Sequence, residues 1–201
     1  MELELKKECL DTYELGEPQT LTQEETAETI VPDYCPDIAR IISAEGVVCL
    51  HGGTEQDGVT GTVRVTVLYT PENESGVRAL EFAMPFSAQG EGLAGCAHVV
   101  VETEIELLES RMLNPRKIFT RCKLVTHLAG CRKVCLTISS DAETDPALLV
   151  EKRCCGQTVS LLRQVAEKDL TFSETMSLSL GREGAAELLH CRANGIVTET
   201  K

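Results

Sequence analysis

The sequence contains no tryptophan among its 201 residues, and aromatic residues make up only 3% of it. A hydrophobic core must therefore be built from aliphatic side chains, and valine, isoleucine and threonine together favour β-strands. Sugar-binding sites use aromatic rings as stacking surfaces, and this chain offers few of them. A β-rich module that binds a ligand or a cell-wall polysaccharide is therefore kept only as an alternative interpretation.

Basic residues are scarce as well, with 19 Lys and Arg against 32 Asp and Glu, for a net charge of −13. A field of that sign repels phosphate backbones and anionic lipid surfaces, so we expect no nucleic-acid partner. No apolar run approaches the length of a membrane span, and residues 1–9 lack the apolar region of a signal peptide. We therefore expect a cytoplasmic protein that does not insert into a membrane.

Catalytic motifs are absent: the chain has no G-x-S-x-G elbow, no P-loop and no H-E-x-x-H. His127, Cys131 and Cys135 have a regular spacing, but zinc usually takes its ligands from C-x2-C or H-x3-H pairs, and no C-x2-C occurs. We expect no enzyme activity, no cofactor and no metal. The ten cysteines are expected to be reduced, buried thiols. A structural zinc protein with Cys and His ligands remains an alternative.

Period-two alternation is the clearest pattern present, and it is strongest in residues 59–69, where the apolar side chains share one parity. Residues 77–86 and 99–107 alternate in the same way. Residues 118–139 are predicted to form a hairpin that turns at Ala129-Gly130, and the acidic residues 16–28 are predicted to be a loop. Short strands separated by Gly and Pro turns predict a mainly β domain, an antiparallel β-sandwich or barrel.

The stretch from Ile30 to Ile42 contains two prolines, Pro32 and Pro36, that fix the backbone at both positions. Pro36 suits the first turn of a helix, and an acidic residue follows it at the positive end of that helix. Three isoleucines then fall at the i, i+3 and i+4 positions of one face. We therefore predict an extended segment, a rigid corner and one short helix after Pro36. The residues of that helix face are Ile38, Ile41 and Ile42.

The stretch from Arg111 to Lys123 holds five cations and no carboxylate. It is either a docking patch for an acidic partner or a structural element. For the second role, Asn114-Pro115 is a typical turn, and Arg116 can pair with Asp33 or Asp37 across the corner. We favour the structural role.

The tail resembles an earlier part of the chain, which suggests the start of a second repeat. We therefore predict a β domain over residues 1–145, followed by linker strands, around Cys154-Cys155, and an incomplete second repeat over 146–201. The matching pairs are Glu25-Thr26 with Glu174-Thr175, Ala39–Ile42 with Ala186–Leu189, and Gly46–Val48 with Gly195–Val197.

Two motifs together resemble a known family. Ile30-Val-Pro-Asp-x-x-Pro-Asp-Ile-x-x-Ile41 is similar to the opening signature of the SPOCS domain of endospore-forming Firmicutes, and Arg111-x-x-Asn-Pro-Arg-Lys-Ile118 is similar to its second signature. Between them, the strand Gly61–Tyr69 and Pro85-Phe86 follow the family's order. The resemblance covers roughly residues 1–140.

The resemblance implies a non-enzymatic module for spore-coat assembly. The family includes SipL-type proteins, which bind a coat-scaffold ATPase at the forespore surface. The resemblance therefore implies a protein partner, possibly that ATPase, and a location in the mother-cell cytoplasm, at the forespore surface or in the spore coat. Self-association is left open. This chain shows no LysM module, which members often carry, so we expect a short paralogue or a fragment. The signature residues are the interaction candidates. They are Pro32, Asp33, Pro36, Asp37, Ile38, Arg111, Asn114, Arg116 and Lys117.

Overall fold

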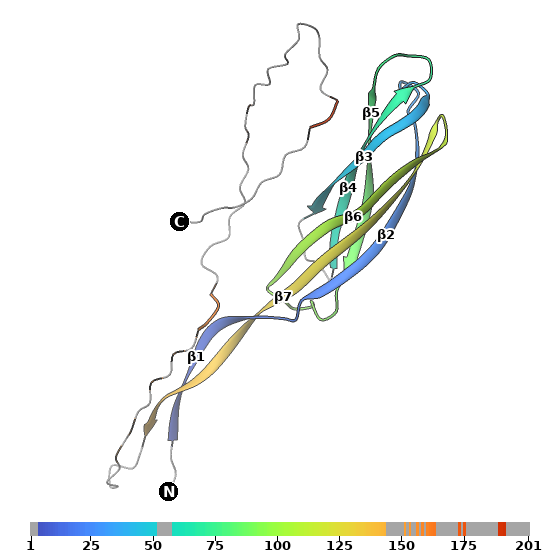
Figure 1. The fold of residues 1–201 in the computed structure, drawn as a ribbon. Coiled ribbons are helices and arrows are strands. Elements are labelled where there is room, and N and C mark those ends of the chain that lie inside the picture. Colours follow the sequence, from blue (N-terminus) through green and yellow to red (C-terminus); the bar gives the residue numbers. More distant parts are fainter. Residues whose placement is uncertain are drawn as a thin grey trace.

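The computed structural model describes residues 4–51 and 58–143, together with residues 151, 153, 156, 158, 160–163, 173, 175 and 189–191. This part of the chain is all β, with antiparallel strands in two sheets and no helix, which confirms the predicted β class (Figure 1). Accordingly, no helix that could cross a membrane occurs among the described residues. The strands are β1 (Glu4–Leu15), β2 (Gln19–Ile30), β3 (Ile38–His51), β4 (Gly58–Pro71), β5 (Arg78–Gln89), β6 (His98–Asn114) and β7 (Lys117–Glu143).

The strand β7 is the centre of the first sheet, with β6 on one edge and β1 and β2 on the other. Gly130 O accepts from Gly16 N at 2.7 Å, whereas Cys131 O accepts from Ala97 N at 2.8 Å. Consecutive carbonyls of a strand point to opposite edges, so β1 lies on the edge that β6 does not occupy. Therefore β1 and β2 follow each other along one edge of β7.

The second sheet, in the order β3-β4-β5, packs face to face with β6, β7 and β2. The predicted alternation of β4 is present: its odd-numbered side chains are buried between the sheets, opposite the even-numbered side chains of β7. Burial of these aliphatic side chains is the main favourable term for the fold. The largest cluster contains Val31, Ile38, Val63, Val65, Val67, Tyr69, Leu80, Met84, Phe86, Ile118, Cys122 and Leu124.

The short helix predicted after Pro36 is wrong, because β3 begins at Ile38. Its register against β4 shifts between Ile38 and Arg40 and again between Ile41 and Ser43. Each shift adds one residue to the strand, so inward side chains at first recur every three residues instead of every two. That spacing imitates the face of a helix. Ile42, expected on the buried face, is 50% exposed.

The loop predicted over residues 16–28 is also wrong, since most of it belongs to β2. The polar sequence of β2 is compatible with a strand because it lies at a sheet edge and its outward carboxylates meet cations of β7. Glu24 pairs with Arg121 at 2.6 Å, and Glu28 pairs with Lys117. Opposite charges on neighbouring strands stabilise the pairing.

The hairpin predicted at Ala129-Gly130 does not form, because β7 runs through both residues. Gly130 does not form a turn; its lack of a side chain lets Cys96 pack closely against the strand. A Cβ at position 130 would lie 2.6 Å from Cys96 Sγ. A glycine inside a strand often marks such an approach.

Beyond Cys131, β1 and β7 leave the sandwich as a two-stranded ribbon, which we call the arm (residues 4–15 and 131–143) (Figure 1). Cys9 and Cys135 join its strands as a disulfide with Cα atoms 5.6 Å apart. The expectation that all cysteines are reduced is therefore wrong for this pair. The remaining described cysteines are free.

Two predictions fall almost wholly outside the described residues: the linker strands around Cys154-Cys155 and the second repeat. Of that region, Leu162 makes a bridge to Tyr13, and its carbonyl accepts from the Thr12 hydroxyl at 3.0 Å.

Gly61 gives a test of the packing between the sheets. A Cβ at this position would lie 2.4 Å from Phe86 Cζ and 3.0 Å from Cys49 O. We expect Gly61→Ala to lower the free energy of unfolding by about 1–3 kcal/mol, because overpacking forces neighbours to move. The same change at Gly156, which has nothing within 4 Å of its Cβ position, is the control. Equal urea midpoints for the two variants would contradict the packing at Gly61.

Candidate functional site

Both predicted signatures meet at one end of the sandwich, in a structure we call the corner (residues 31–37 and 114–117). Residues 31–37 carry the chain from β2 in the first sheet to β3 in the second. Cys35 N donates to Pro32 O at 2.9 Å, which closes a turn within this segment. Val31 and Ile38, at its two ends, are fully buried and anchor it on the core.

The turn between β6 and β7 is the surface on which the segment 31–37 lies. Asn114 Oδ1 accepts from Arg116 N at 2.9 Å, an arrangement typical of a turn that begins with asparagine. The backbone of this turn then accepts from both ends of the segment: Arg116 O from Val31 N, and Pro115 O from Ile38 N, each at 2.9 Å. The two signatures are thus hydrogen-bonded to each other through the main chain.

The Arg116 guanidinium adds four further contacts, all to the segment 31–37. Nη1 donates to Cys35 O at 2.7 Å and to an Asp37 carboxylate oxygen at 3.0 Å. Nη2 donates to Val31 O at 3.0 Å and to an Asp33 carboxylate oxygen at 3.1 Å. Arg116 is predicted to pair with Asp33 or Asp37, and the structure shows it paired with both. Arginine suits the position because its planar fork presents several donors in fixed directions.

The second sheet also holds the corner. Asp37 O accepts from Glu72 N at 2.9 Å, and the Tyr69 hydroxyl donates to Pro36 O at 3.4 Å. Burial of Tyr69, and next the neighbouring Cys35 thiol, raise the pKa of its phenol above the usual value. Tyr69 therefore remains a neutral donor well above neutral pH, and the corner is fixed from both sheets.

The other cations of the Arg111–Lys123 stretch have partners within the chain. In addition to the pairs of Lys117 and Arg121 with β2, Lys123 pairs with Glu106 at 2.9 Å, and Arg111 lies 4.9 Å over the Phe119 ring. The hydrogen bond and charge of Glu24 raise the pKa of Arg121. These contacts agree with the structural role that we favour for the stretch.

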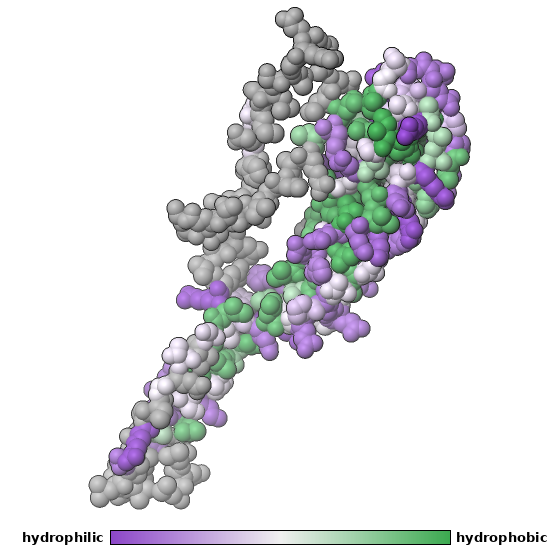
Figure 2. Space-filling view, viewed as in Figure 1, coloured by the Kyte–Doolittle hydropathy of each residue, from purple (hydrophilic) through white to green (hydrophobic). Residues whose placement is uncertain are grey.

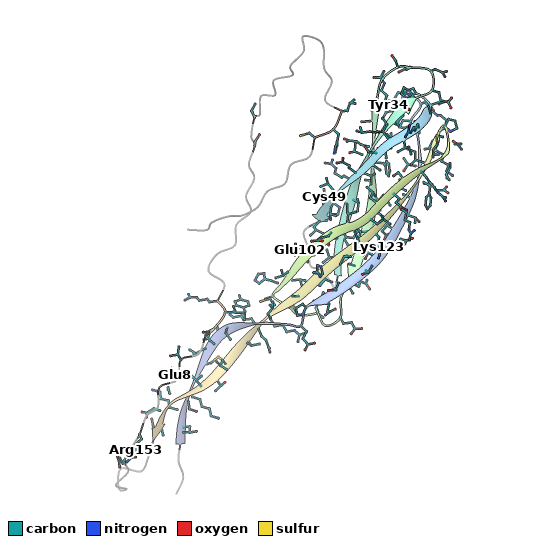
Figure 3. All side chains as sticks on the ribbon, viewed as in Figure 1. Glu8, Tyr34, Cys49, Glu102, Lys123 and Arg153 are labelled. Atoms are coloured by element: carbon teal, nitrogen blue, oxygen red, sulfur yellow. A yellow bond between two sulfur atoms is a disulfide. The ribbon has the colours of Figure 1, made fainter. Side chains whose placement is uncertain are left out.

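The sequence reasoning missed the apolar side chains that point outward at the corner and on the strand ends beside it. Ile30 is 71% exposed and Tyr34 is 88% exposed. Lys117 pairs with Ile30 on one side and with Asn114 on the other, so the end of β6, with exposed Met112 and Leu113, lies at the same end of the sheet. Figure 3 places Tyr34 at the end of the sandwich away from the arm. A tyrosine between two Pro-Asp pairs was the available signal.

The candidate zinc ligands do not come together. His127, Cys131 and Cys135 lie four residues apart along the single strand β7, or about 13 Å from one to the next. His127 Nδ1 bonds to the Thr20 hydroxyl at 3.0 Å, and Cys135 is in the disulfide. No group of three His, Cys, Asp or Glu in the described part of the chain could hold a metal.

A shallow hollow of about 800 Å³ lies on the outer face of the first sheet, beside Glu24, Glu109 and Phe119. Phe119 would be its stacking surface for a sugar. The Arg111 guanidinium already occupies one face of that ring. The hollow therefore gives little support to the polysaccharide alternative.

Comparison of the chain with protein-family models, curated proteins and solved structures finds no match in any of the three.

Arg116 should be the most sensitive residue of the corner. We expect Arg116→Lys to lower the free energy of unfolding by about 2–4 kcal/mol, because one ammonium group cannot reach four acceptors and leaves backbone carbonyls unsatisfied. Arg121→Lys is the matched control, since its single ion pair with Glu24 is exposed and contributes little. Equal urea denaturation midpoints for the two variants would show that the guanidinium network does not stabilise the corner.

Cys122 should be the least reactive of the free thiols that the structure describes. Burial, and next the charge of Glu25, raise its pKa to about 11, so at pH 8 the thiol is protonated and not nucleophilic. We expect iodoacetamide at pH 8 to label the exposed Cys191 well before Cys122, as measured by peptide mass spectrometry. In urea the two should react alike. Equal labelling of the folded protein would contradict the burial of Cys122.

Proposed function

We propose that this chain is a non-enzymatic protein–protein interaction module that resembles the SPOCS domain and acts in spore-coat assembly. Its partner would be a coat-scaffold ATPase, and its place the forespore surface in the mother cell. The observation that supports the proposal is the group of exposed apolar side chains at the corner, where the two motifs of the resemblance meet.

This group has the properties of a binding surface. Tyr34 and Ile30 expose apolar area although the core lies close by, and exposed apolar clusters on soluble proteins often mark interaction sites. Tyrosine is enriched at such sites because it combines a large ring with a polar tip.

The signature residues would act indirectly in this proposal. Arg116 forms ion pairs with Asp33 and Asp37, and these pairs hold the segment 31–37 in one conformation. A surface that is already ordered loses less conformational entropy when it binds. Tyr34, which no hydrogen bond holds in the described structure, would make the contact.

A fluorescent fusion in sporulating cells tests the proposal. We expect a ring around the forespore that disappears when the coat-scaffold ATPase is deleted. The double variant Ile30→Ala/Tyr34→Ala should lose the ring but keep the melting temperature, because both side chains are exposed. Val100→Ala, an exposed apolar position at the far end of β6, is the control and should keep the ring.

Two results would reject the proposal. A diffuse signal of the unaltered chain in the mother cell would remove the assembly role. A ring that survives the double variant would remove the corner as the binding surface.

A further inference from the structure

The arm contains a strand edge that the described part of the chain leaves unpaired. β6 pairs with β7 only as far as His98 opposite Cys131. Beyond that point β1 occupies the other edge of β7, and no described strand pairs with the edge along residues 132–143. An unpaired edge presents a row of backbone N–H and C=O groups that can accept another strand.

Pairing with a further strand would stabilise the arm. A two-stranded ribbon by itself is at best marginally stable in water, and no described strand extends the arm at its free edge. Val134 and Ile138 are half-buried, and Leu136 is 37% exposed, on the face that continues from the core side of β7. Figure 2 shows apolar side chains between the charged ones along the arm.

The order of side chains along this edge is self-complementary. Its first residue is a cation, Arg132, its middle is apolar, and Asp141 lies near its end. The register against β1 shifts near Ser140, since Ser139 faces Lys7 and Asp141 faces Lys6. The extra residue returns the Asp141 side chain to the face of Arg132 and Leu136.

We propose that the arm is a dimerisation element, in which the free edge of β7 pairs antiparallel with the same edge of a second copy of this chain. The two-fold axis passes between Leu136 and Leu136 of the second copy. Val134 then lies opposite Ile138, and Arg132 opposite Asp141, on both sides of the axis. The result is a continuous sheet in the order β1-β7-β7-β1, with the same surface used by both copies.

The backbone geometry permits this register. Cys131 O points to the edge of β6, so the odd-numbered residues that follow direct their N–H and C=O groups to the free edge. In the proposed register Cys135 of one copy faces Thr137 of the other, and Lys133 faces Ser139 in the same way. These odd-numbered residues form hydrogen-bonded pairs. Leu136 belongs to a non-hydrogen-bonded pair, where side chains approach most closely.

The contacts described for the two charged residues are compatible with the pairing. Arg132 Nη2 donates to Gly92 O, and Asp141 Oδ1 accepts from Ala142 N. A guanidinium has five N–H donors and a carboxylate accepts several bonds, so both can add one contact. Of the other edge strands, β3 and β6 face each other along one side of the sandwich, and β2 lies beside β5.

Sedimentation velocity of the purified full chain over a concentration series tests the inference, with the Cys9–Cys135 disulfide intact. The unaltered chain should form a dimer. Leu136→Glu should prevent it by placing two carboxylates at the axis. Thr137→Pro should also prevent it, because that N–H points to the free edge and not to β1.

Charge reversal identifies the register. Arg132→Glu and Asp141→Arg should each weaken the dimer about tenfold, because the two-fold axis converts two attractive pairs into repulsive ones. The double variant should restore it. The two positions are about 30 Å apart within one strand, so rescue can only occur between copies. Arg40→Glu, an exposed charge on β3, is the control and should leave the dimer unchanged.

A monomer at every concentration would overturn the inference, as would a dimer that Leu136→Glu leaves intact. Absence of rescue in the double variant would overturn the register. The inference is independent of the proposed function, because a monomer that still forms a ring around the forespore would reject only the dimer.

Discussion

One guanidinium group holds one of the chain connections between the two sheets. The segment 31–37 is the covalent passage from the first sheet to the second, and Arg116 binds two of its carbonyls and two of its carboxylates. Such a passage has few apolar side chains of its own, so its shape depends on polar contacts. With these contacts made, Val31 and Ile38 enter the core at a fixed distance from each other.

The regular parts of this fold could be predicted from the sequence, and the irregular parts could not. β4 is buried on one face along its whole length, so its period of two is visible without knowledge of its neighbours. β3 is a strand of the same sheet, but two register shifts place its first inward side chains three residues apart. That spacing suggests a helix. β2 depends on partners 97 and 89 residues away, Arg121 for Glu24 and Lys117 for Glu28, and its own composition is that of a loop.

The same distinction applies to the corner. Opposite charges in two conspicuous motifs were enough to predict that Arg116 pairs with Asp33 or Asp37, and the structure shows it paired with both. The Pro-Asp pairs on either side single out Tyr34, but they do not determine whether its side chain is buried or exposed. The exposure of Tyr34 depends on the path of the segment 31–37 across the end of the sandwich, and only the three-dimensional structure shows that path.

The disulfide of the arm joins residues that are 126 positions apart. At a translation rate of roughly 5–20 residues per second, Cys135 leaves the ribosome roughly 6 to 25 s after Cys9. Five other cysteines are synthesised in that interval, and each can react with Cys9 before the native partner exists. Strand pairing over such a separation is also slow to form. Among the described strands, β1 is therefore the first to be made and the last to find its partner.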